Sequence, residues 1–578
     1  MCAITEPEAP QPLRSMAAAT AQLLAADGRF AMRTVDVGGV RTRTWVEGPP
    51  TLRAIAEASA GRGDSPALVY HDERISHAGF HRAVAALARR LVGDFGVAPG
   101  DRVALAMRNY PEWVIGFFAA TAVGAVAVPL NSWWTARELE FGLRDSEACV
   151  VLADGERLTR LADVLPGLAV PVIATRTGTA ALPEGVWAWT FPEPGSDPGP
   201  LPAAAPEPDD PAAIFYTAGT TGLPKGAVAS HRNMLSNITS AAYAQMRAFV
   251  RLGLDPADVA AFIDALPPPA VLTVLPLFHA TGAQTVMLPT LDAGGTLVLM
   301  RRWDPTQALG LIERERIHRV TGVPAMFADL LAAPGFADHD LSSLLSVSSG
   351  GAPAAPALVS RVRGTLHDLT VAQGYGLTEC SAIATVNAGA DLAHRPGSVG
   401  APVAVVDVKV VDPLGAELPA GEVGEVWIRG PGVVHGYWRR PEETAAAFTD
   451  GWLHTGDLGR LDDEGFLSIV DRAKDMIIRG GENVYCVEVE AAVHEHPAVV
   501  EVAVLGVPHE VLGEEVGAVV RIAPGGRLDG AGLRAFLEPR IAAFKIPAHV
   551  RIGTAELPRN PAGKLLKKRL REQHGWGA

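Results

Sequence analysis

The feature that most constrains this chain is the run from Tyr216 to Gly226, which reads Tyr-Thr-Ala-Gly-Thr-Thr-Gly-Leu-Pro-Lys-Gly. Glycines let backbone N–H groups crowd against an anion, and a concave loop lined by such groups binds phosphate. Lys225 adds a point charge suited to a polyphosphate. The run is not a Walker A loop, because Pro224 precedes the lysine and no Ser or Thr follows it. It predicts a phosphate loop of another kind; a flexible Gly/Thr turn is the alternative.

Length and composition describe a globular chain of several domains. Its 578 residues exceed what one core usually supports, and 48% of them are hydrophobic and 20% charged. A net charge of −14 without a basic stripe argues against nucleic-acid binding. The four cysteines form no CxxC pair, so we expect neither a zinc site nor a disulfide framework, and a reduced cytoplasmic location.

No membrane or secretory segment is predicted. The first fourteen residues lack a charged region leading into an apolar core. The longest apolar stretch, 114–130, contains two glycines and a proline and is shorter than the roughly 18–20 residues of a spanning helix. It predicts a buried helix followed by a buried strand.

Beyond a tail over 1–50, strands alternate with helices, which favours parallel sheets covered on both faces. Thr135 and Glu138 form a capping box at one helix start. Strands are predicted at 103–107, 125–128, 150–153, 274–277, 296–300, 319–321, 345–348 and 369–372. From about 397 the chain becomes β-rich, and past 471 a separate α+β unit follows. The fold class is therefore α/β: a large N-terminal domain with parallel α/β-layered sheets and a β-rich subdomain, plus a small α+β C-terminal domain.

The run Tyr216–Gly226 resembles the phosphate loop of the adenylate-forming enzymes: acyl-CoA synthetases, aryl-CoA ligases, beetle luciferases and peptide-synthetase adenylation domains. Ala218 stands where that superfamily more often has serine. The resemblance extends from about Thr51 to the end of the chain. It implies an AMP-binding domain over 51–473 and a mobile C-terminal domain over 474–578, with the hinge at Lys474.

The segment Gln373–Glu379, Gln-Gly-Tyr-Gly-Leu-Thr-Glu, resembles the adenine and metal motif of this superfamily. The resemblance implies that Tyr375 lies against adenine, that Thr378 bonds the α-phosphate and that Glu379 holds Mg²⁺. A strand-to-helix turn is the simpler interpretation. Asp457, in Thr-Gly-Asp, would bind the ribose hydroxyls, and Arg472 would add a contact.

The nucleotide-binding residues implied by the resemblance lie in five segments. They are Thr217, Ala218, Gly219, Thr220, Thr221, Gly222, Lys225, Gly351, Ala352, Pro353, Gly374, Tyr375, Gly376, Asp457 and Arg472. Thr221 and Glu379 are the implied metal-binding residues. Gly350–Pro353 taken alone passes as an ordinary turn.

The acyl side is less specific. His279, in Pro-Leu-Phe-His, resembles the histidine that borders the acyl pocket, although a lone histidine is often a core residue. Ala283 replaces the aromatic gate of some long-chain members. Small residues at Ala280, Gly282, Ala283, Gly350 and Gly351 predict an open pocket for a medium-chain, long-chain or bulky hydrophobic acid.

Two segments of the C-terminal unit complete the pattern. Arg479, Gly480, Gly481 and Glu482 form a loop that the resemblance places on the CoA side. Lys564 ends a Pro-Arg-Asn-Pro-Ala-Gly-Lys turn and is the implied catalytic lysine, which reaches the α-phosphate and the acyl carboxylate. Alone, it heads a basic tract typical of a solvated helix face.

These residues predict an ATP-dependent acyl-CoA synthetase. Its catalytic residues are Lys564, Glu379, Thr378 and His279, with ATP and Mg²⁺ as cofactors and CoA as co-substrate. The partners are a small carboxylic acid, ATP and CoA, with no nucleic acid; a homodimer is compatible with the sequence. The alternatives are an enzyme that loads a carrier protein, an aryl-CoA ligase, acyl-AMP formation without CoA, an oxygenase of the luciferase kind, and a non-catalytic nucleotide sensor.

Overall fold

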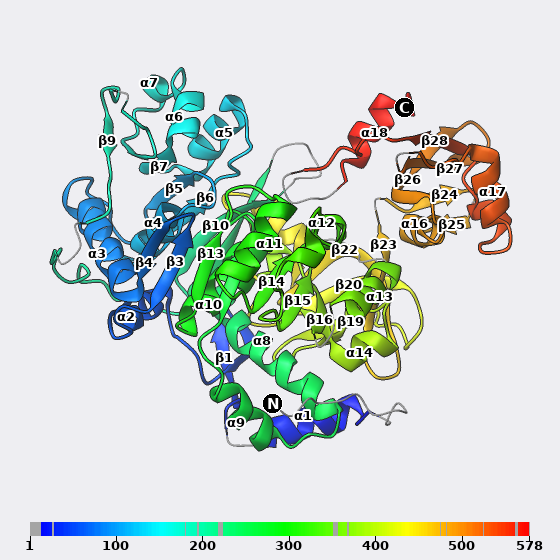
Figure 1. Cartoon of the computed structure of the whole chain (residues 1–578), viewed down its shortest axis with the longest axis horizontal. Helices are drawn as coiled ribbons and strands as arrows, with labels where there is room; N and C mark the ends of the chain where they lie inside the picture. The colour runs from blue at the N-terminus through cyan, green and yellow to red at the C-terminus, as the bar shows by residue number, and fades with distance from the viewer. Residues whose placement is uncertain are drawn as a thin grey trace.

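Two large sheets, with helices between and around them, form the body of the molecule (Figure 1). This computed structural model describes residues 13–25, 28–179, 181–192, 196–217, 224–350, 356–366, 369–473, 475–480, 482–523, 525–560 and 565–576.

The first large sheet has seven strands in the order β11-β10-β6-β5-β7-β8-β9. All neighbours in it are parallel except β10 and β11, which form an antiparallel hairpin. Its strands are β5 (Arg102–Ala106), β6 (Val126–Pro129), β7 (Val150–Asp154), β8 (Val172–Thr175), β9 (Val186–Ala188), β10 (Pro211–Thr217) and β11 (Lys225–Ser230). The predicted phosphate loop therefore connects the two strands of the edge hairpin.

The second large sheet has nine strands in the order β18-β17-β16-β15-β14-β12-β13-β3-β4. The six strands from β16 to β3 are parallel, and β4, β17 and β18 are antiparallel to their neighbours. Its strands are β3 (Pro66–Tyr70), β4 (Glu73–Ser76), β12 (Ala270–Thr273), β13 (Thr296–Leu299), β14 (Arg319–Gly322), β15 (Ser346–Ser349), β16 (Thr370–Tyr375), β17 (Thr385–Ala388) and β18 (Ala401–Pro402).

Three smaller sheets complete the fold. An N-terminal hairpin pairs β1 (Met32–Val37) with β2 (Val40–Trp45). The β-rich sheet contains β19 (Asp407–Val411), β20 (Gly424–Arg429), β21 (Phe448–Thr449), β22 (Trp452–Leu461) and β23 (Leu467–Arg472). The C-terminal sheet contains β24 (Ile477–Arg479), β25 (Glu482–Val484), β26 (Val499–His509), β27 (Gly513–Ile522) and β28 (His549–Gly553).

Helices cover the sheets. In the large domain they are α1 (Met16–Ala25), α2 (Leu52–Ala60), α3 (His77–Gly93), α4 (Pro111–Ala122), α5 (Ala136–Ser146), α6 (Gly155–Leu161), α7 (Leu165–Leu168), α8 (His231–Arg251), α9 (Pro256–Asp264), η1 (Thr281–Met287), α10 (Leu288–Asp292), α11 (Pro305–Arg314), α12 (Pro324–Ala332), η2 (Phe336–Asp338), α13 (Pro356–Thr365), η3 (Thr378–Cys380), α14 (Gly389–His394) and α15 (Pro441–Ala447). In the C-terminal unit they are α16 (Cys486–His494), α17 (Gly530–Leu537), η4 (Ala543–Lys545) and α18 (Lys567–Gln573).

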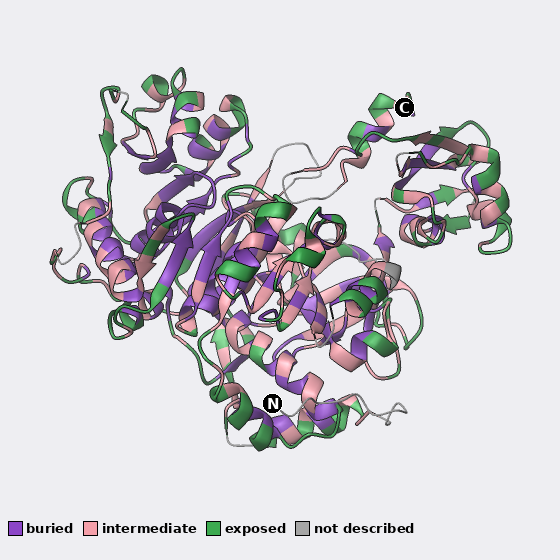
Figure 2. Ribbon diagram, viewed as in Figure 1, coloured by how far each residue is buried: buried purple, intermediate pink, exposed green. Residues whose placement is uncertain are grey.

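The main core lies between the two large sheets. Every residue of α4 is buried, and one apolar cluster joins this helix to strands of both sheets (Figure 2). Trp113 and Phe117 stack within α4, with ring centroids 5.3 Å apart. The C-terminal sheet has a separate core with α16 and α17, and this unit stands apart from the body in Figure 1. A core of its own is what a separate domain needs.

The predicted α/β class with two domains is confirmed, and so is the capping box between Thr135 and Glu138. The predicted strand at 274–277 is wrong, because the strand ends at Thr273. Beyond Thr273 the side chain of Asn109 takes the place of a neighbouring strand as hydrogen-bond partner. Its Nδ2 donates to Leu275 O at 2.9 Å, and its Oδ1 accepts from Leu277 N at 2.9 Å. Within the predicted tail, residues 16–25 form α1 and residues 32–45 form the β1–β2 hairpin, with Trp45 buried against Tyr243 of α8.

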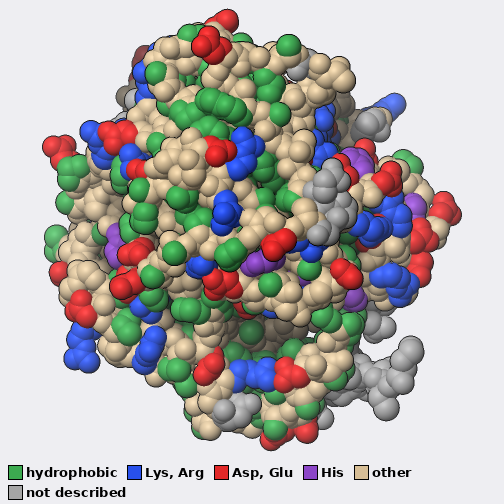
Figure 3. Space-filling model, turned by 90° about the vertical axis from the view of Figure 1, so that its left-hand side faces the viewer, with side chains coloured by type: hydrophobic (Ala, Val, Ile, Leu, Met, Phe, Trp, Pro, Cys, Tyr) green, Lys and Arg blue, Asp and Glu red, His purple; other side chains and the backbone are tan. Residues whose placement is uncertain are grey.

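No helix among the described residues is long and apolar enough to cross a membrane. On the face seen in Figure 3, acidic and basic side chains are interspersed. Of the cysteines, Cys380 and Cys486 are buried and Cys149 is half-buried, all three as free thiols, whereas Cys2 lies outside the described residues.

Candidate functional site

The β10–β11 hairpin sets both ends of the predicted phosphate loop. Its register pairs Thr217 with Lys225 and Tyr216 with Gly226. An added Cβ on Gly226 would lie 2.5 Å from Ile214 Cγ2, so only glycine fits there. Eleven predicted site residues lie outside the described residues: Ala218, Gly219, Thr220, Thr221, Gly222, Gly351, Ala352, Pro353, Lys474, Gly481 and Lys564.

Glu379 lies next to this hairpin, in contact with Thr217. It belongs to η3, the short turn that follows β16, and both Glu379 and Thr378 are half-buried. Its Oε1 accepts a hydrogen bond from Tyr437 Oη at 2.9 Å and a longer one from Thr217 Oγ1 at 3.4 Å. Lys225 Nζ lies 5.2 Å from the centroid of the Tyr437 ring. The structure thus places two predicted site residues, Thr217 and Lys225, beside the hydrogen-bonded pair of Glu379 and Tyr437.

Tyr437 was absent from the sequence prediction. It lies 58 residues from Glu379, in the segment before α15, and its local sequence carries no pattern that marks it. Its neighbours hold it in place: Trp438 Nε1 donates to Asp145 O at 3.0 Å, and Arg440 Nη2 donates to Asp145 Oδ1 at 2.6 Å. Burial, followed by the Glu379 carboxylate, raises the pKa of Tyr437, which therefore remains a hydrogen-bond donor at neutral pH.

A second cluster forms around Asp457, which is buried on β22. Tyr375 Oη donates to its Oδ2 at 2.7 Å, and Arg472 Nε lies 3.1 Å from its Oδ1. The register of β22 and β23 pairs Asp457 with Arg472 directly. Burial and then the Asp457 carboxylate raise the pKa of Tyr375 well above its ordinary value. Each carboxylate oxygen has a second lone pair, so this pairing leaves acceptor capacity for a ligand.

The end of β16 and the turn that follows it join the two clusters. Tyr375 belongs to the Asp457 cluster, and Glu379, four positions later, belongs to the hairpin cluster. Gly376 lies between them, and an added Cβ there would lie 2.4 Å from Ala382 O. Close backbone packing therefore requires this glycine. Gly374 is less restricted, with Thr385 O at 3.5 Å from the same test atom.

His279 is half-buried at the start of the segment that becomes η1, a π-helix. Its backbone N–H donates to Pro276 O at 3.1 Å, and its ring lies 4.5 Å from that of Phe278. Two neighbours that we expected to widen an acyl pocket are closely packed. Ala283 is fully buried in the main core, and a Cβ on Gly282 would lie 2.4 Å from Pro276 O.

The predicted CoA-side loop is the turn of the β24–β25 hairpin. Gly480 has a left-handed φ of +59° there, and its N–H donates to Leu512 O at 2.8 Å. Arg479 Nη2 lies 3.3 Å from Glu515 Oε1 of β27, and Glu482 is exposed. The contacts described for these residues lie inside the C-terminal unit.

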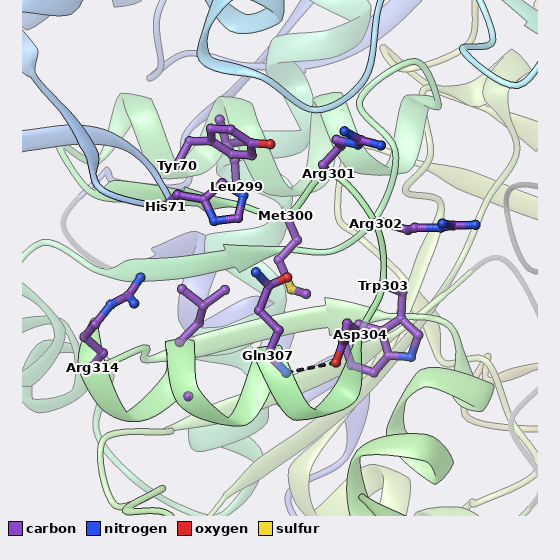
Figure 4. A pocket seen from close by; sticks show the side chains of 12 residues that line it. Tyr70, His71, Leu299, Met300, Arg301, Arg302, Trp303, Asp304, Gln307 and Arg314 are labelled. Atoms are coloured by element: carbon purple, nitrogen blue, oxygen red, sulfur yellow. Dashed lines mark hydrogen bonds between the residues drawn. The ribbon is translucent and has the colours of Figure 1, made fainter. Parts of the chain in front are cut away.

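A basic cavity of about 480 Å³ opens beside the second large sheet, between the β3–β4 turn, the end of β13 and α11 (Figure 4). His71, Arg301, Arg302 and Arg314 contribute its basic side chains. Arg108 lies nearby with its guanidinium 3.5 Å from the Trp133 ring centroid. Burial, then Arg157, and further arginines that include Arg301 lower the pKa of Arg108 to about 10. Asp304 also lines the cavity and Arg314 is paired with Glu315 at 2.8 Å, so the positive charge of the cavity comes mainly from Arg301 and Arg302.

The chain is similar to known proteins over most of its length. The family model described as AMP-binding enzyme matches residues 55–438, and that described as AMP-binding enzyme C-terminal domain matches 488–564. A feruloyl-CoA synthase of Amycolatopsis is 38% identical over 523 residues, which cover 90% of this chain and 97% of that protein. A long-chain-fatty-acid–CoA ligase of Bacillus subtilis is 33% identical over 552 residues, 90% and 94% of the two chains. The structure of the amide bond synthetase McbA from Marinactinospora thermotolerans matches with a TM-score of 0.78 and 30% identity, covering 90% of this chain and 99% of that one.

Proposed function

We propose a reaction for this chain on the basis of its family. The chain belongs to the AMP-binding enzymes of the adenylate-forming superfamily, in the acyl-CoA synthetase branch, and is a ligase. A carboxylate displaces pyrophosphate from ATP to give an acyl-adenylate. The thiol of CoA then attacks the acyl carbon and releases AMP. The first step is needed because the charge of a free carboxylate repels nucleophiles.

The observation that carries the proposal is the meeting of the two clusters at the end of β16. Phosphates would lie between the hairpin residues 217 and 225 and the η3 residues Thr378 and Glu379. Tyr375 would lie against adenine, and Asp457, supported by Arg472, would accept from the ribose hydroxyls. Residues 218–222, 351–353 and Lys564 are assigned to the same site from the sequence alone.

The residues around Glu379 fit Mg²⁺. Both described hydrogen bonds to this carboxylate go to Oε1. Within the described part of the chain, no group of three or more acidic, His or Cys side chains gathers as a metal cage. Mg²⁺ is typically held by one or two carboxylates together with substrate phosphates and water. Glu379 would supply the carboxylate, Thr221 is the second metal residue expected from sequence, and Tyr437 would orient Glu379. The ion, when bound, neutralises phosphate charge.

The basic cavity is the candidate region for the phosphorylated nucleotide portion of CoA. Its arginines supply charge that CoA phosphates would neutralise, and clustered guanidinium groups favour phosphate. The C-terminal hairpin, with Arg479, Gly480, Gly481 and Glu482, would then present a glycine-lined path for pantetheine after the domain turns about Lys474.

For the acyl group we propose a medium-chain, long-chain or bulky hydrophobic acid, with an aryl acid as the second candidate. The two CoA-forming relatives bear names of both kinds, feruloyl-CoA synthase and long-chain-fatty-acid–CoA ligase. Transfer of the acyl group to an acceptor other than CoA is a further candidate, since the structural relative McbA is an amide bond synthetase. A homodimer stays a prediction.

The test is pyrophosphate release measured over a panel from acetate to C18 acids, benzoates, cinnamates and ring acids, without and with CoA. We expect release only with ATP and a suitable acid, and acyl-CoA only when CoA is present. If acyl-adenylate forms with good acids but is never converted to acyl-CoA, the proposal that CoA is the acyl acceptor is wrong. No release with any acid would overturn the proposed reaction.

A further inference from the structure

Three buried polar side chains meet beside the loop that carries Glu379. Asn237 lies on α8, Gln284 on η1 and Ser381 just after η3, with 1%, 0% and 0% of their surfaces exposed. The Asn237 side-chain Nδ2 donates to the backbone carbonyl of Ser381, and also to Gln284 Oε1 at 3.3 Å. One amide therefore links α8, η1 and the η3 loop.

This link determines which way the Gln284 amide faces. A backbone carbonyl only accepts, so the Asn237 atom next to it must be the nitrogen. That same nitrogen faces Gln284, so the Gln284 atom opposite it must be the oxygen. The amide flip that is ordinarily ambiguous is thus resolved by the network. Gln284 Nε2 then points away from Asn237 with both of its N–H groups.

Those N–H groups are not used by the described part of the protein. Among the described residues, Gln284 Nε2 has no hydrogen-bond partner, although it is completely shielded from solvent. Ser381 Oγ, in the same cluster, is also without a partner. Buried polar groups are nearly always bonded, and a buried donor without an acceptor is costly. The bond from Asn237 accounts for the carbonyl half of the Gln284 side chain, but nothing in the described structure accounts for its amino half.

The position of Gln284 suggests what the donor is for. Ala283 N donates to His279 O at 3.1 Å, which places Gln284 one turn beyond the histidine proposed to border the acyl group. On the other side, Ser381 N donates to Thr378 O at 3.1 Å, beside the residues proposed to contact phosphate. η1 is π-helical, a rare geometry that occurs often at functional sites.

We infer that Gln284 is a specificity residue and that the acyl group carries an oxygen acceptor, such as a hydroxyl, methoxyl or keto oxygen, which accepts a hydrogen bond from Gln284 Nε2. This inference rests on the proposed function, because it assumes that the acyl group binds beside His279. It narrows the substrate class from hydrophobic acids in general to oxygen-bearing ones.

The experiment compares matched acids that differ by one oxygen: cinnamate with its hydroxy and methoxy derivatives, and octanoate with its keto and hydroxy derivatives. The readout is kcat/KM for pyrophosphate release by the full chain. We expect the wild type to favour at least one oxygenated acid by about tenfold or more over its parent. Gln284→Leu should bring that ratio to near one by losing activity on the oxygenated acid. Gln245→Leu, a half-exposed glutamine on α8, is the matched control and should keep the ratio.

An equal rate for every pair in the wild type would overturn the inference, as would a preference that survives Gln284→Leu. If the leucine variant fails to fold, as judged by its melting temperature, Gln284→Glu replaces it. This variant exchanges the donor for an acceptor and should reverse the preference for methoxy and keto acids, whose oxygens only accept. An unchanged ratio for these acids would overturn the inference. Pyrophosphate release with acids of both kinds but no preference would leave the proposed function standing, whereas no release with any acid would remove both.

Discussion

The nucleotide side of the candidate site and its CoA-side hairpin are organised differently. On the nucleotide side, side chains from separate segments already bond one another: Glu379 with Tyr437 and Thr217, and Asp457 with Tyr375 and Arg472. At the β24–β25 hairpin, Arg479 and Gly480 bond to Glu515 and Leu512 of their own domain. The nucleotide side is therefore assembled within the large domain, whereas the predicted CoA-side hairpin belongs to the C-terminal unit.

This difference suggests how two reactions share one site. Preorganised groups contribute most when they need not move at the moment of reaction. The residue after the hinge position, Asp475, donates its N–H to Arg472 O at 2.9 Å, and Arg472 in turn contacts Asp457. We propose that a hinge at 474 would begin next to the nucleotide cluster and would couple rotation of the small domain to nucleotide chemistry. The predictions below test whether the two halves separate in this way.

The largest effect is expected for Lys564→Ala. Loss of the one cation proposed for the transferring phosphate should slow acyl-adenylate formation by about 10²–10³-fold, by analogy with other preorganised donors. Transfer from supplied acyl-AMP to CoA should be nearly unchanged. Lys568→Ala, an exposed lysine on the following helix, is the control. Equal losses in both half-reactions would mean that Lys564 has a structural role.

Lys474→Pro should produce the opposite separation. Proline locks φ near −65°, so the domain could no longer turn at this position. Adenylation should persist while thioester formation slows severely, as measured by acyl-CoA release from preformed acyl-AMP. Gly481→Leu should obstruct the pantetheine path and impair the same step alone. Normal acyl-CoA synthesis by the proline variant would rule out the two-conformation mechanism for this protein.

Asp457→Ala should weaken ATP binding by about tenfold or more, because the variant removes the proposed partner of two hydroxyls and also frees Tyr375 and Arg472. Calorimetry with ATP is the measurement. Asp463→Ala, an exposed aspartate in the turn after β22, should bind ATP normally. An unchanged affinity for the Asp457 variant would contradict the ribose assignment.

A smaller effect is expected for Tyr437→Phe, which removes one hydroxyl bonded to Glu379. The Mg²⁺ concentration required for ATP binding should rise several-fold, in line with a net hydrogen bond of about 0.5–1.5 kcal/mol. Glu379→Gln should raise it further. Tyr485→Phe, in the small domain, is the control. If Tyr437→Phe shows wild-type Mg²⁺ dependence while Glu379→Gln does not, Tyr437 does not orient the carboxylate.

The same contrast separates what could be predicted from the sequence from what could not. The hairpin ends at Thr217 and Lys225, the turn from Gly374 to Glu379 and the pair Asp457 and Arg472 were predicted because each resembles a motif of the superfamily. Tyr437, the basic cavity and Gln284 were not, since each depends on partners far away in sequence: 58 residues separate Tyr437 from Glu379, and 47 separate Gln284 from Asn237.

By itself, the sequence determined the α/β class and the two-domain order, because hydrophobic periodicity is a local property. It also predicted the nucleotide motifs, because short glycine-rich turns can be compared with a known superfamily without a structure. Only the tertiary structure decided that Val274–Leu277 leaves its strand, where the Asn109 side chain takes over the backbone hydrogen bonds. It also decided that Gly282 is small because Pro276 O leaves no room for a Cβ, and that Ala283 lies within the main core. A small side chain looks the same in sequence whether it borders a ligand or a packed neighbour, and only packing distinguishes the two.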